Sequence, residues 1–174
     1  RAMGAFEFRP AIERQQNQPT VLDLRELVEE ARKVFSVGSD FLKGDPDEAI
    51  LQLIQVGTSA GGATAKAVIG YNPETNAIVS GQFNLPSGYE HWLLKINTSS
   101  DETKDFGRIE YAYYLMARAC GISISDSDLL AIGDRMHFMT KRFDRGDADG
   151  SKKHMQTLCA MAELDYNLVA THDY

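Results

Sequence analysis

Residues 56–67 restrict the fold of this chain more than any other stretch, because they join an expected helix to an expected strand and are rich in glycine. They include Gly57, Gly61, Gly62 and Lys66, and they contain no acidic residue. Glycines let backbone N–H groups turn toward an anion without a side chain in the way, and a lysine adds a point charge. The stretch therefore suits phosphate binding, although it matches neither a Walker A loop nor G-x-G-x-x-G. A plain flexible connection is the alternative interpretation.

Helix and strand signals surround this stretch. Asp45, Pro46 and Glu48 are typical of a helix start and predict a helix over residues 46–55. Short or alternating apolar runs separated by turn residues predict five strands, at 63–71, 77–81, 91–96, 127–132 and 136–143.

A long helix is expected between the third and fourth of these strands. Asp105 can cap a helix over residues 106–120, and Gly121 follows its end. One face of that helix is shared by Ile109, Ala112, Tyr113, Met116 and Cys120. Further patterns predict a strand at 4–8, a linker at 10–19, and helices at 21–35 and 153–164. The plan is a small, mainly antiparallel sheet with packed helices, which is an α+β architecture.

The composition indicates one ordinary globular domain and excludes several classes of partner. The chain has 174 residues, of which 43% are hydrophobic and 25% charged, and its net charge is -7. This acidic balance argues against direct nucleic-acid binding. No apolar run approaches a membrane span and no signal peptide opens the chain, so we expect a cytoplasmic protein without a membrane partner. Cys120 and Cys159 are expected to be buried thiols in a reducing compartment and not part of a disulfide framework.

One lysine lies in an otherwise apolar strand. Lys95 lies within the run 91–96, and Glu110 follows fifteen residues later, in the first turn of the expected helix. A lysine is costly to bury unless it is paired, and Glu110 is a natural partner. A lysine held by a helix carboxylate beside a glycine loop is how protein kinases orient ATP phosphates. The alternative is that Lys95 faces water and Glu110 complements the helix N-terminus.

Taken in order, four segments of the chain resemble HipA-type toxin kinases. They are the glycine-rich loop 57–66, the strand 91–96, the helix segment 110–117, and the residues Lys141, Arg142, Phe143, Asp144 and Arg145. The last segment lies where a kinase small lobe continues into its large lobe. The resemblance extends from residue 1, where the chain is similar to the end of the family's N-terminal subdomain, to about residue 165.

The resemblance implies a fold, an activity and partners. Members of the family are bacterial serine/threonine protein kinases with a divergent protein-kinase-like fold, and they act as toxins in toxin–antitoxin pairs. Studied members phosphorylate aminoacyl-tRNA synthetases. The implied cofactors are ATP and, in the complete kinase, Mg²⁺. The implied partners are a cognate antitoxin and a protein substrate such as an aminoacyl-tRNA synthetase.

The resemblance also implies a role for individual residues. Lys95 would contact the ATP phosphates, and Glu110 would hold it in place. Lys141 and Phe143 would meet the adenine through their backbones. The nucleotide-facing residues of the glycine-rich loop would be Gly61, Gly62 and Lys66.

Ser59 lies seven residues before Lys66, where the family has its regulatory autophosphorylated serine. The neighbouring Thr58 is the alternative acceptor. A phosphoserine adds about -1.5 to -2 charges at neutral pH. Those charges would lie close to the ATP γ-phosphate, so we expect the modification to silence the kinase.

These implications divide the chain into three parts. Residues 1–18 would end the N-terminal subdomain, 19–145 would form the kinase-like small lobe, and 146–174 would begin a truncated large lobe. The family's catalytic and metal-binding aspartates belong to that large lobe, and neither Asp165 nor Asp173 follows a recognisable catalytic-loop sequence. We therefore expect no catalytic residue and no metal ligand here, and little phosphate transfer by this chain alone. The alternative function is a non-catalytic, kinase-like module that binds an antitoxin or a partner lobe.

Overall fold

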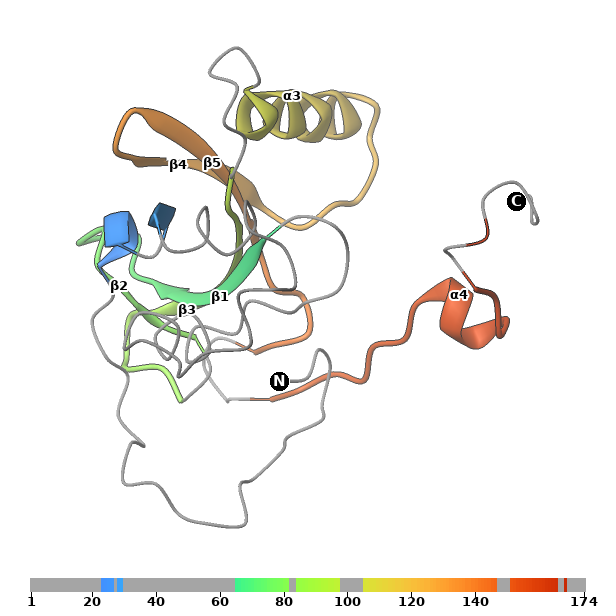
Figure 1. Cartoon of the computed structure of the whole chain (residues 1–174). Coiled ribbons are helices and arrows are strands. Elements are labelled where there is room, and N and C mark those ends of the chain that lie inside the picture. The colour runs from blue at the N-terminus through green and yellow to red at the C-terminus, as the bar shows by residue number, and fades with distance from the viewer. Residues whose placement is uncertain are drawn as a thin grey trace, which may run out of the picture.

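A computed structural model describes residues 23–26, 28–29, 65–81, 84–97, 105–146, 151–165 and 168. Its elements, in chain order, are β1 (Lys66–Tyr71), β2 (Ile78–Ser80), β3 (Glu90–Lys95), α3 (Phe106–Ala119), β4 (Ser127–Ile132), β5 (Arg135–Lys141) and α4 (Leu158–Met161) (Figure 1). The predicted strand at 4–8, the predicted helix at 46–55 and the glycine-rich stretch as far as residue 64 lie outside the described residues.

The five strands form one antiparallel sheet in the order β2-β1-β3-β5-β4. All five predicted strands are confirmed, with boundaries that differ by up to three residues from the expected ones. The turns have physical causes that the sequence carries. Asn76, in the turn before β2, has a φ of 57°, and Gly133, between β4 and β5, has a φ of 64°. Both residue types tolerate this left-handed backbone. The α+β class is therefore confirmed.

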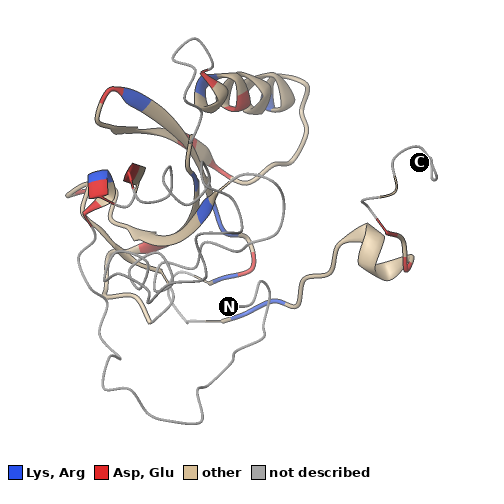
Figure 2. Cartoon of the chain, in the orientation of Figure 1, with Lys and Arg blue, Asp and Glu red and all other residues tan. Residues whose placement is uncertain are grey.

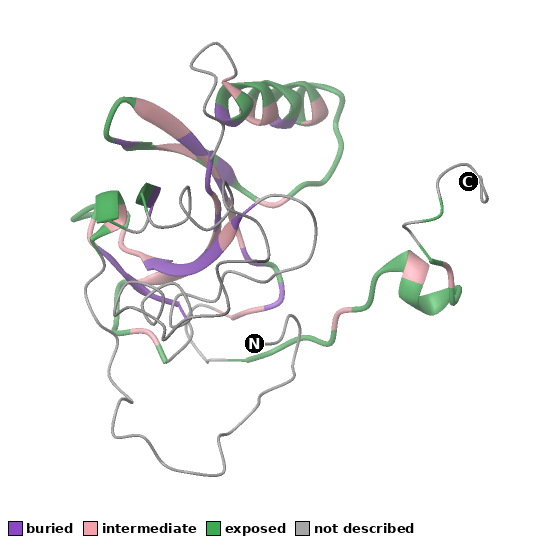
Figure 3. Cartoon of the chain, in the orientation of Figure 1, coloured by how far each residue is buried: buried purple, intermediate pink, exposed green. Residues whose placement is uncertain are grey.

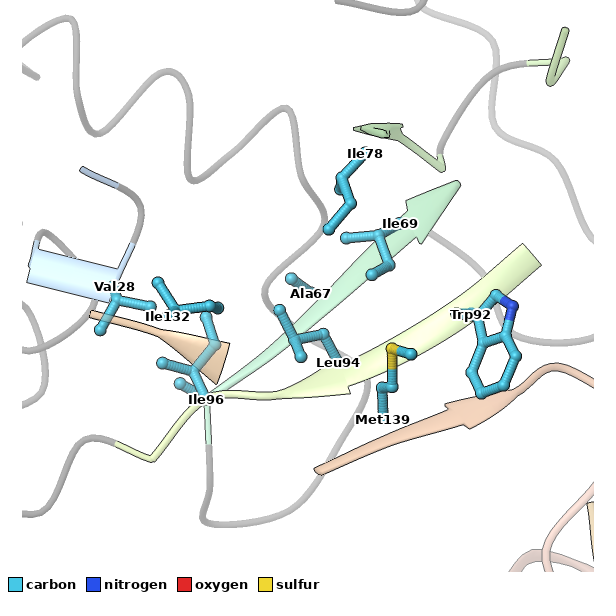
Figure 4. Packing of buried hydrophobic residues seen from close by; sticks show 10 residues of the cluster. Val28, Ala67, Ile69, Ile78, Trp92, Leu94, Ile96, Ile132 and Met139 are labelled. Carbon is cyan, nitrogen blue, oxygen red and sulfur yellow. The ribbon is translucent and has the colours of Figure 1, made fainter. Parts of the chain in front are cut away.

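The main core lies on one face of the sheet, because alternate residues of neighbouring strands point the same way. Its central members are Ala67, Ile69, Trp92, Leu94 and Met139, all buried (Figure 4). Figure 3 shows buried stretches, in purple, along the strands of the sheet. Val28 packs against this cluster from helical residues 24–26 and 28–29, which lie within the helix predicted at 21–35. Burying a side chain such as Ile69, Leu94 or Met139 contributes roughly 1.5–3 kcal/mol to the free energy of unfolding. The opposite face of the sheet carries the polar residues discussed below.

Helix α3 approaches the sheet closely at its start. Asp105 caps it, since its side chain accepts a hydrogen bond from the Arg108 N–H. Gly107 is buried against β5, where an added Cβ would collide with the carbonyl oxygen of Met136. The helix ends as predicted, before Gly121 with its φ of 76°.

The apolar face that the sequence assigns to this helix is not the face that packs. Ile109, Tyr113 and Met116 are 50%, 66% and 53% exposed, whereas Tyr114 is 6% exposed. Cys120, on the same side of the helix, is exposed and Cys159 of α4 is only half-buried, so the prediction that both thiols are buried is wrong. The packed side follows Gly107 by helical spacing. The close backbone approach at Gly107 therefore decides which side of α3 meets the sheet.

The helix predicted at 153–164 is wrong in length, because α4 covers only Leu158–Met161. Residues 151–153 instead pair with the segment that follows β5: Gly146 N–H donates to the Ser151 carbonyl and Lys153 N–H to the Asp144 carbonyl. Extended pairing prevents a helix there, and α4 begins only after Thr157, whose side chain accepts from the Ala160 N–H. None of the described helices is long and apolar enough to cross a membrane.

Candidate functional site: a lysine–glutamate pair on the outer face of the sheet

Lys95, the last residue of β3, is paired with Glu110 of α3. Lys95 Nζ lies 2.6 Å from Glu110 Oε2, and each side chain is 33% exposed. This confirms the predicted proximity of the two residues. The first turn of α3 holds no acidic residue, so Glu110 is too far along the helix to complement its N-terminus. Its carboxylate is directed at the sheet instead.

A second lysine stands beside this pair. Lys66 begins β1 and is the direct cross-strand partner of Lys95, so both side chains rise from the same face. Burial lowers the pKa of the Lys66 ammonium group, the charge of Lys95 lowers it further, and Glu110 opposes both. The three side chains carry two positive charges and one negative charge. An anion bound there would relieve the repulsion between the two ammonium groups.

An apolar row lies one step further along the same face. Val68, Leu93 and Thr140 are aligned across β1, β3 and β5. Val68 is 8% exposed, and the Thr140 hydroxyl is satisfied by Ser127 Oγ at 3.0 Å. The row is two residues from the lysines, roughly 7 Å along the strands. Sequence reasoning missed these residues, although the period-2 spacing from Lys66 and Lys95 would have identified the first two.

The segment after β5 presents its backbone in a defined way. The Lys141 N–H donates to the Asp126 carbonyl at 2.8 Å, so a backbone contact from Lys141 to a ligand has to use its carbonyl oxygen. Phe143 lies in a turn with its side chain 59% exposed, and its N–H donates to no other described residue. The Lys141 side chain reaches the other face of the sheet, where its Nζ lies 2.9 Å from Glu90 Oε1. The predicted adenine contacts of these two residues stay predictions.

A buried charge cluster that sequence reasoning missed surrounds this turn. Arg142 forms two parallel hydrogen bonds with Asp144, Nε to Oδ1 at 2.9 Å and Nη2 to Oδ2 at 2.6 Å. Arg145 Nη1 lies 3.2 Å from the same Oδ2. Asp144 is 1% exposed and Arg142 6%. Burial and the charge of Arg142 lower the pKa of Arg145, and Asp144 opposes this shift. The signal for this cluster in the sequence was the occurrence of three charged residues, Arg142, Asp144 and Arg145, within four positions.

The remaining predicted site residues lie outside the described part of the chain: Thr58, Ser59, Gly61 and Gly62. Lys66 is the one member of the glycine-rich stretch in the predicted site that the structure places. Among the described residues, no three His, Cys, Asp or Glu side chains come together as a metal site. We therefore assign no described residue to Mg²⁺.

The comparisons with known proteins give one match. The family described as HipA-like C-terminal domain matches residues 58–174, which is more than half of the chain. No curated protein and no solved structure matches the chain. The matched range includes residues 58–67 of the glycine-rich stretch, the Lys95–Glu110 pair and the segment after β5. The chain therefore belongs to the HipA-like family, through the C-terminal domain of that family.

Proposed function

We propose that the chain is the ATP-binding part of a serine/threonine protein kinase of a toxin–antitoxin system, acting in the cytoplasm. The observation that carries the proposal is the 2.6 Å contact between Lys95 Nζ and Glu110 Oε2. Kinase-type phosphoryl transfer depends on positioning and on charge neutralisation, and a lysine held by a helix carboxylate supplies both. Membership of the family is consistent with this reaction class.

The charges of the site suit a triphosphate. Lys66 and Lys95 face one another across β1 and β3, with Glu110 as their nearby carboxylate. Glu110 holds the Lys95 ammonium group in one position, so little side-chain entropy remains to be lost when a phosphate oxygen arrives. In the complete kinase, bound Mg²⁺ would supply further neutralisation of phosphate charge. Figure 2 shows lysine or arginine positions, in blue, on strands of the sheet.

The rest of the outer face suits the base and sugar. The buried Val68 and the half-buried Leu93 make the face beside the lysines apolar, and the turn at Phe143 offers a backbone N–H. Phe138 of β5 is the cross-strand partner of Lys95, and Phe143 follows it by five residues. At about 3.3 Å per residue, the two residues are at most roughly 16 Å apart. ATP, with phosphates at one end and a base at the other, can extend over such a site.

The proposal is tested by replacing the lysine at the centre of the site. Lys95→Met should weaken ATP binding to the chain by about tenfold to a hundredfold, since charge-assisted hydrogen bonds contribute about 1.5–3 kcal/mol. Lys153→Met is the matched control, because Lys153 is exposed and the substitution removes the same charge. Isothermal titration calorimetry with ATP and Mg²⁺ measures both. Equal affinities of the two variants would refute the assignment.

A second function is favoured by a separate observation. Ile109, Tyr113 and Met116 are exposed along one side of α3, and exposed apolar side chains at helical spacing can form a protein interface. A non-catalytic module that binds an antitoxin or partner lobe would use such a side. Under this alternative, ATP does not bind wild-type protein, and Tyr113→Asp weakens antitoxin binding. Under the leading proposal, Tyr113→Asp leaves ATP affinity unchanged.

A further inference from the structure

The turn that follows β5 contains a buried Arg–Asp–Arg cluster, which consists of Arg142, Asp144 and Arg145. Asp144 is 1% exposed and accepts two parallel hydrogen bonds from Arg142 and one from Arg145. Arg145 Nη1 also donates to the Asp144 carbonyl at 3.0 Å. One carboxylate therefore organises both neighbouring guanidinium groups.

The geometry of the cluster fixes the residue that it encloses. Arg142 and Asp144 flank Phe143, and their side chains are joined by a two-point contact. The backbone on either side is also tied: Arg142 N–H donates to the His91 carbonyl of β3, and the Asp144 carbonyl accepts from Lys153 N–H. With both ends held, the peptide plane that carries the Phe143 N–H has little freedom to rotate. The Phe143 side chain is 59% exposed and contributes no such restraint.

Stability alone is a weak reason for such a cluster. Burying an ion pair costs desolvation that its attraction often fails to repay, and well-packed apolar residues stabilise equally well. A bidentate arginine–carboxylate pair does provide a fixed direction. The residue whose direction it fixes is Phe143, whose N–H donates to no other described residue.

We infer that the Arg–Asp–Arg cluster is a positioning device that sets base selectivity by holding the Phe143 N–H toward the base of the bound nucleotide. The inference rests on the proposed ATP-binding function. Adenine presents an amino donor at position 6 and a ring acceptor at position 1. Hypoxanthine presents the reverse order, an oxygen acceptor and an N–H donor. The Lys141 carbonyl can accept from the adenine amino group while the Phe143 N–H donates to the ring acceptor. With hypoxanthine, the carbonyl would face an oxygen and the N–H would face another N–H, so these groups would stay unpaired.

The experiment compares ATP, inosine triphosphate and inorganic tripolyphosphate by isothermal titration calorimetry on the full chain. Wild-type protein should bind ATP at least about tenfold more tightly than inosine triphosphate. Asp144→Asn should reduce this ratio to about twofold and leave the tripolyphosphate affinity unchanged. A residue with a merely structural role would weaken all three ligands in proportion.

Further variants keep the test decisive. Arg142→Lys retains the charge but loses the parallel bonds, so it should lower the ratio as well, and it decides the matter if Asp144→Asn does not fold. Ile132→Ala is the control, because Ile132 is a buried residue of β4 outside the cluster and its loss should destabilise the fold without changing the ratio. Phe143→Pro removes the N–H itself, and Asp144→Asn should then cause no further loss of selectivity.

The outcomes separate the inference from the proposed function. If wild-type protein binds ATP selectively and both cluster variants keep the wild-type ratio, the inference is wrong and the proposed function stands. A wild-type protein that binds ATP without selectivity over inosine triphosphate also overturns the inference. If wild-type protein binds neither ATP nor tripolyphosphate, the proposed function itself fails.

Discussion

Lys66 and Lys95 are direct cross-strand partners at one end of β1 and β3, and Lys95 Nζ lies 2.6 Å from Glu110 Oε2 of α3. Two ammonium groups therefore rise side by side next to one carboxylate. These three side chains together carry more positive than negative charge on a partly buried surface. That excess is the physical basis of the phosphate-binding proposal.

The coupling of these charges predicts the direction in which the Lys66 pKa responds to substitution. Lys95→Met should raise the Lys66 pKa toward its ordinary value, because it removes a like charge. Glu110→Gln should lower that pKa further, because the carboxylate supports the charged form. NMR titration of the Lys66 side chain measures both shifts. Two shifts of the same sign would contradict the described cluster.

The same lowered pKa predicts a dependence of stability on pH. Between the folded pKa of Lys66 and its higher unfolded value, the unfolded chain binds more protons than the folded chain, so this group's contribution to the free energy of unfolding rises with pH. Below the folded pKa, Lys66 is protonated in both states and lowers the free energy of unfolding by an amount that does not change with pH. In Lys66→Met this component is absent, so the wild-type minus variant difference in unfolding free energy should rise with pH across the window. Urea unfolding across the alkaline range checks the slope.

Lys95 and Glu110 should act as one unit in ATP binding. Lys95→Met removes the ammonium group, and Glu110→Gln removes the carboxylate that orients it. Because either change alone abolishes the same oriented contact, the double variant should bind ATP about as weakly as Lys95→Met does. The expected interaction energy is about 1 kcal/mol or more, in the range measured for residues in contact. Calorimetry on the four proteins of the cycle gives the value. Additive losses would mean that Glu110 does not position Lys95.

Gly107 should be intolerant of any side chain. Gly107→Ala places a methyl group into the Met136 carbonyl and should cost about 1–3 kcal/mol of unfolding free energy, in the range for overpacking. Gly133→Asn is the control, since Gly133 faces open space and asparagine tolerates its left-handed backbone. Urea unfolding compares the two. Because the displaced helix carries Glu110, Gly107→Ala should also weaken ATP binding.

Ser59 is predicted to be a regulatory phosphorylation site, and it lies outside the described residues. Ser59→Asp should weaken ATP binding, because the added negative charge repels the phosphates, whereas Ser59→Ala should not. Thr58→Asp, which places the charge one residue earlier, tests the alternative acceptor. In the complete kinase, Ser59→Ala should remain active. Phosphosite mapping that finds the modification only elsewhere, together with an unaffected Ser59→Asp, would remove this role.

Local signals were sufficient for the positions of the sheet strands and of α3. Turn residues such as Asn76 and Gly133 and the Asp105 cap act within a few residues of chain, so their effect is readable without the fold. The Lys95–Glu110 pair was predictable for a related reason. A lysine in an apolar strand needs a partner, and Glu110 comes early in the helix that follows this strand.

Tertiary structure alone decided the rest. The close approach at Gly107 turns Glu110 and Tyr114 toward the sheet and leaves Ile109 and Tyr113 exposed, because backbone contact at one residue sets the rotation of the whole helix. Strand register, which depends on pairing between distant segments, places Lys66 opposite Lys95. Pairing of residues 151–153 with the segment after β5 shortens the expected last helix to α4, since a backbone N–H already bonded across strands cannot also bond within a helix.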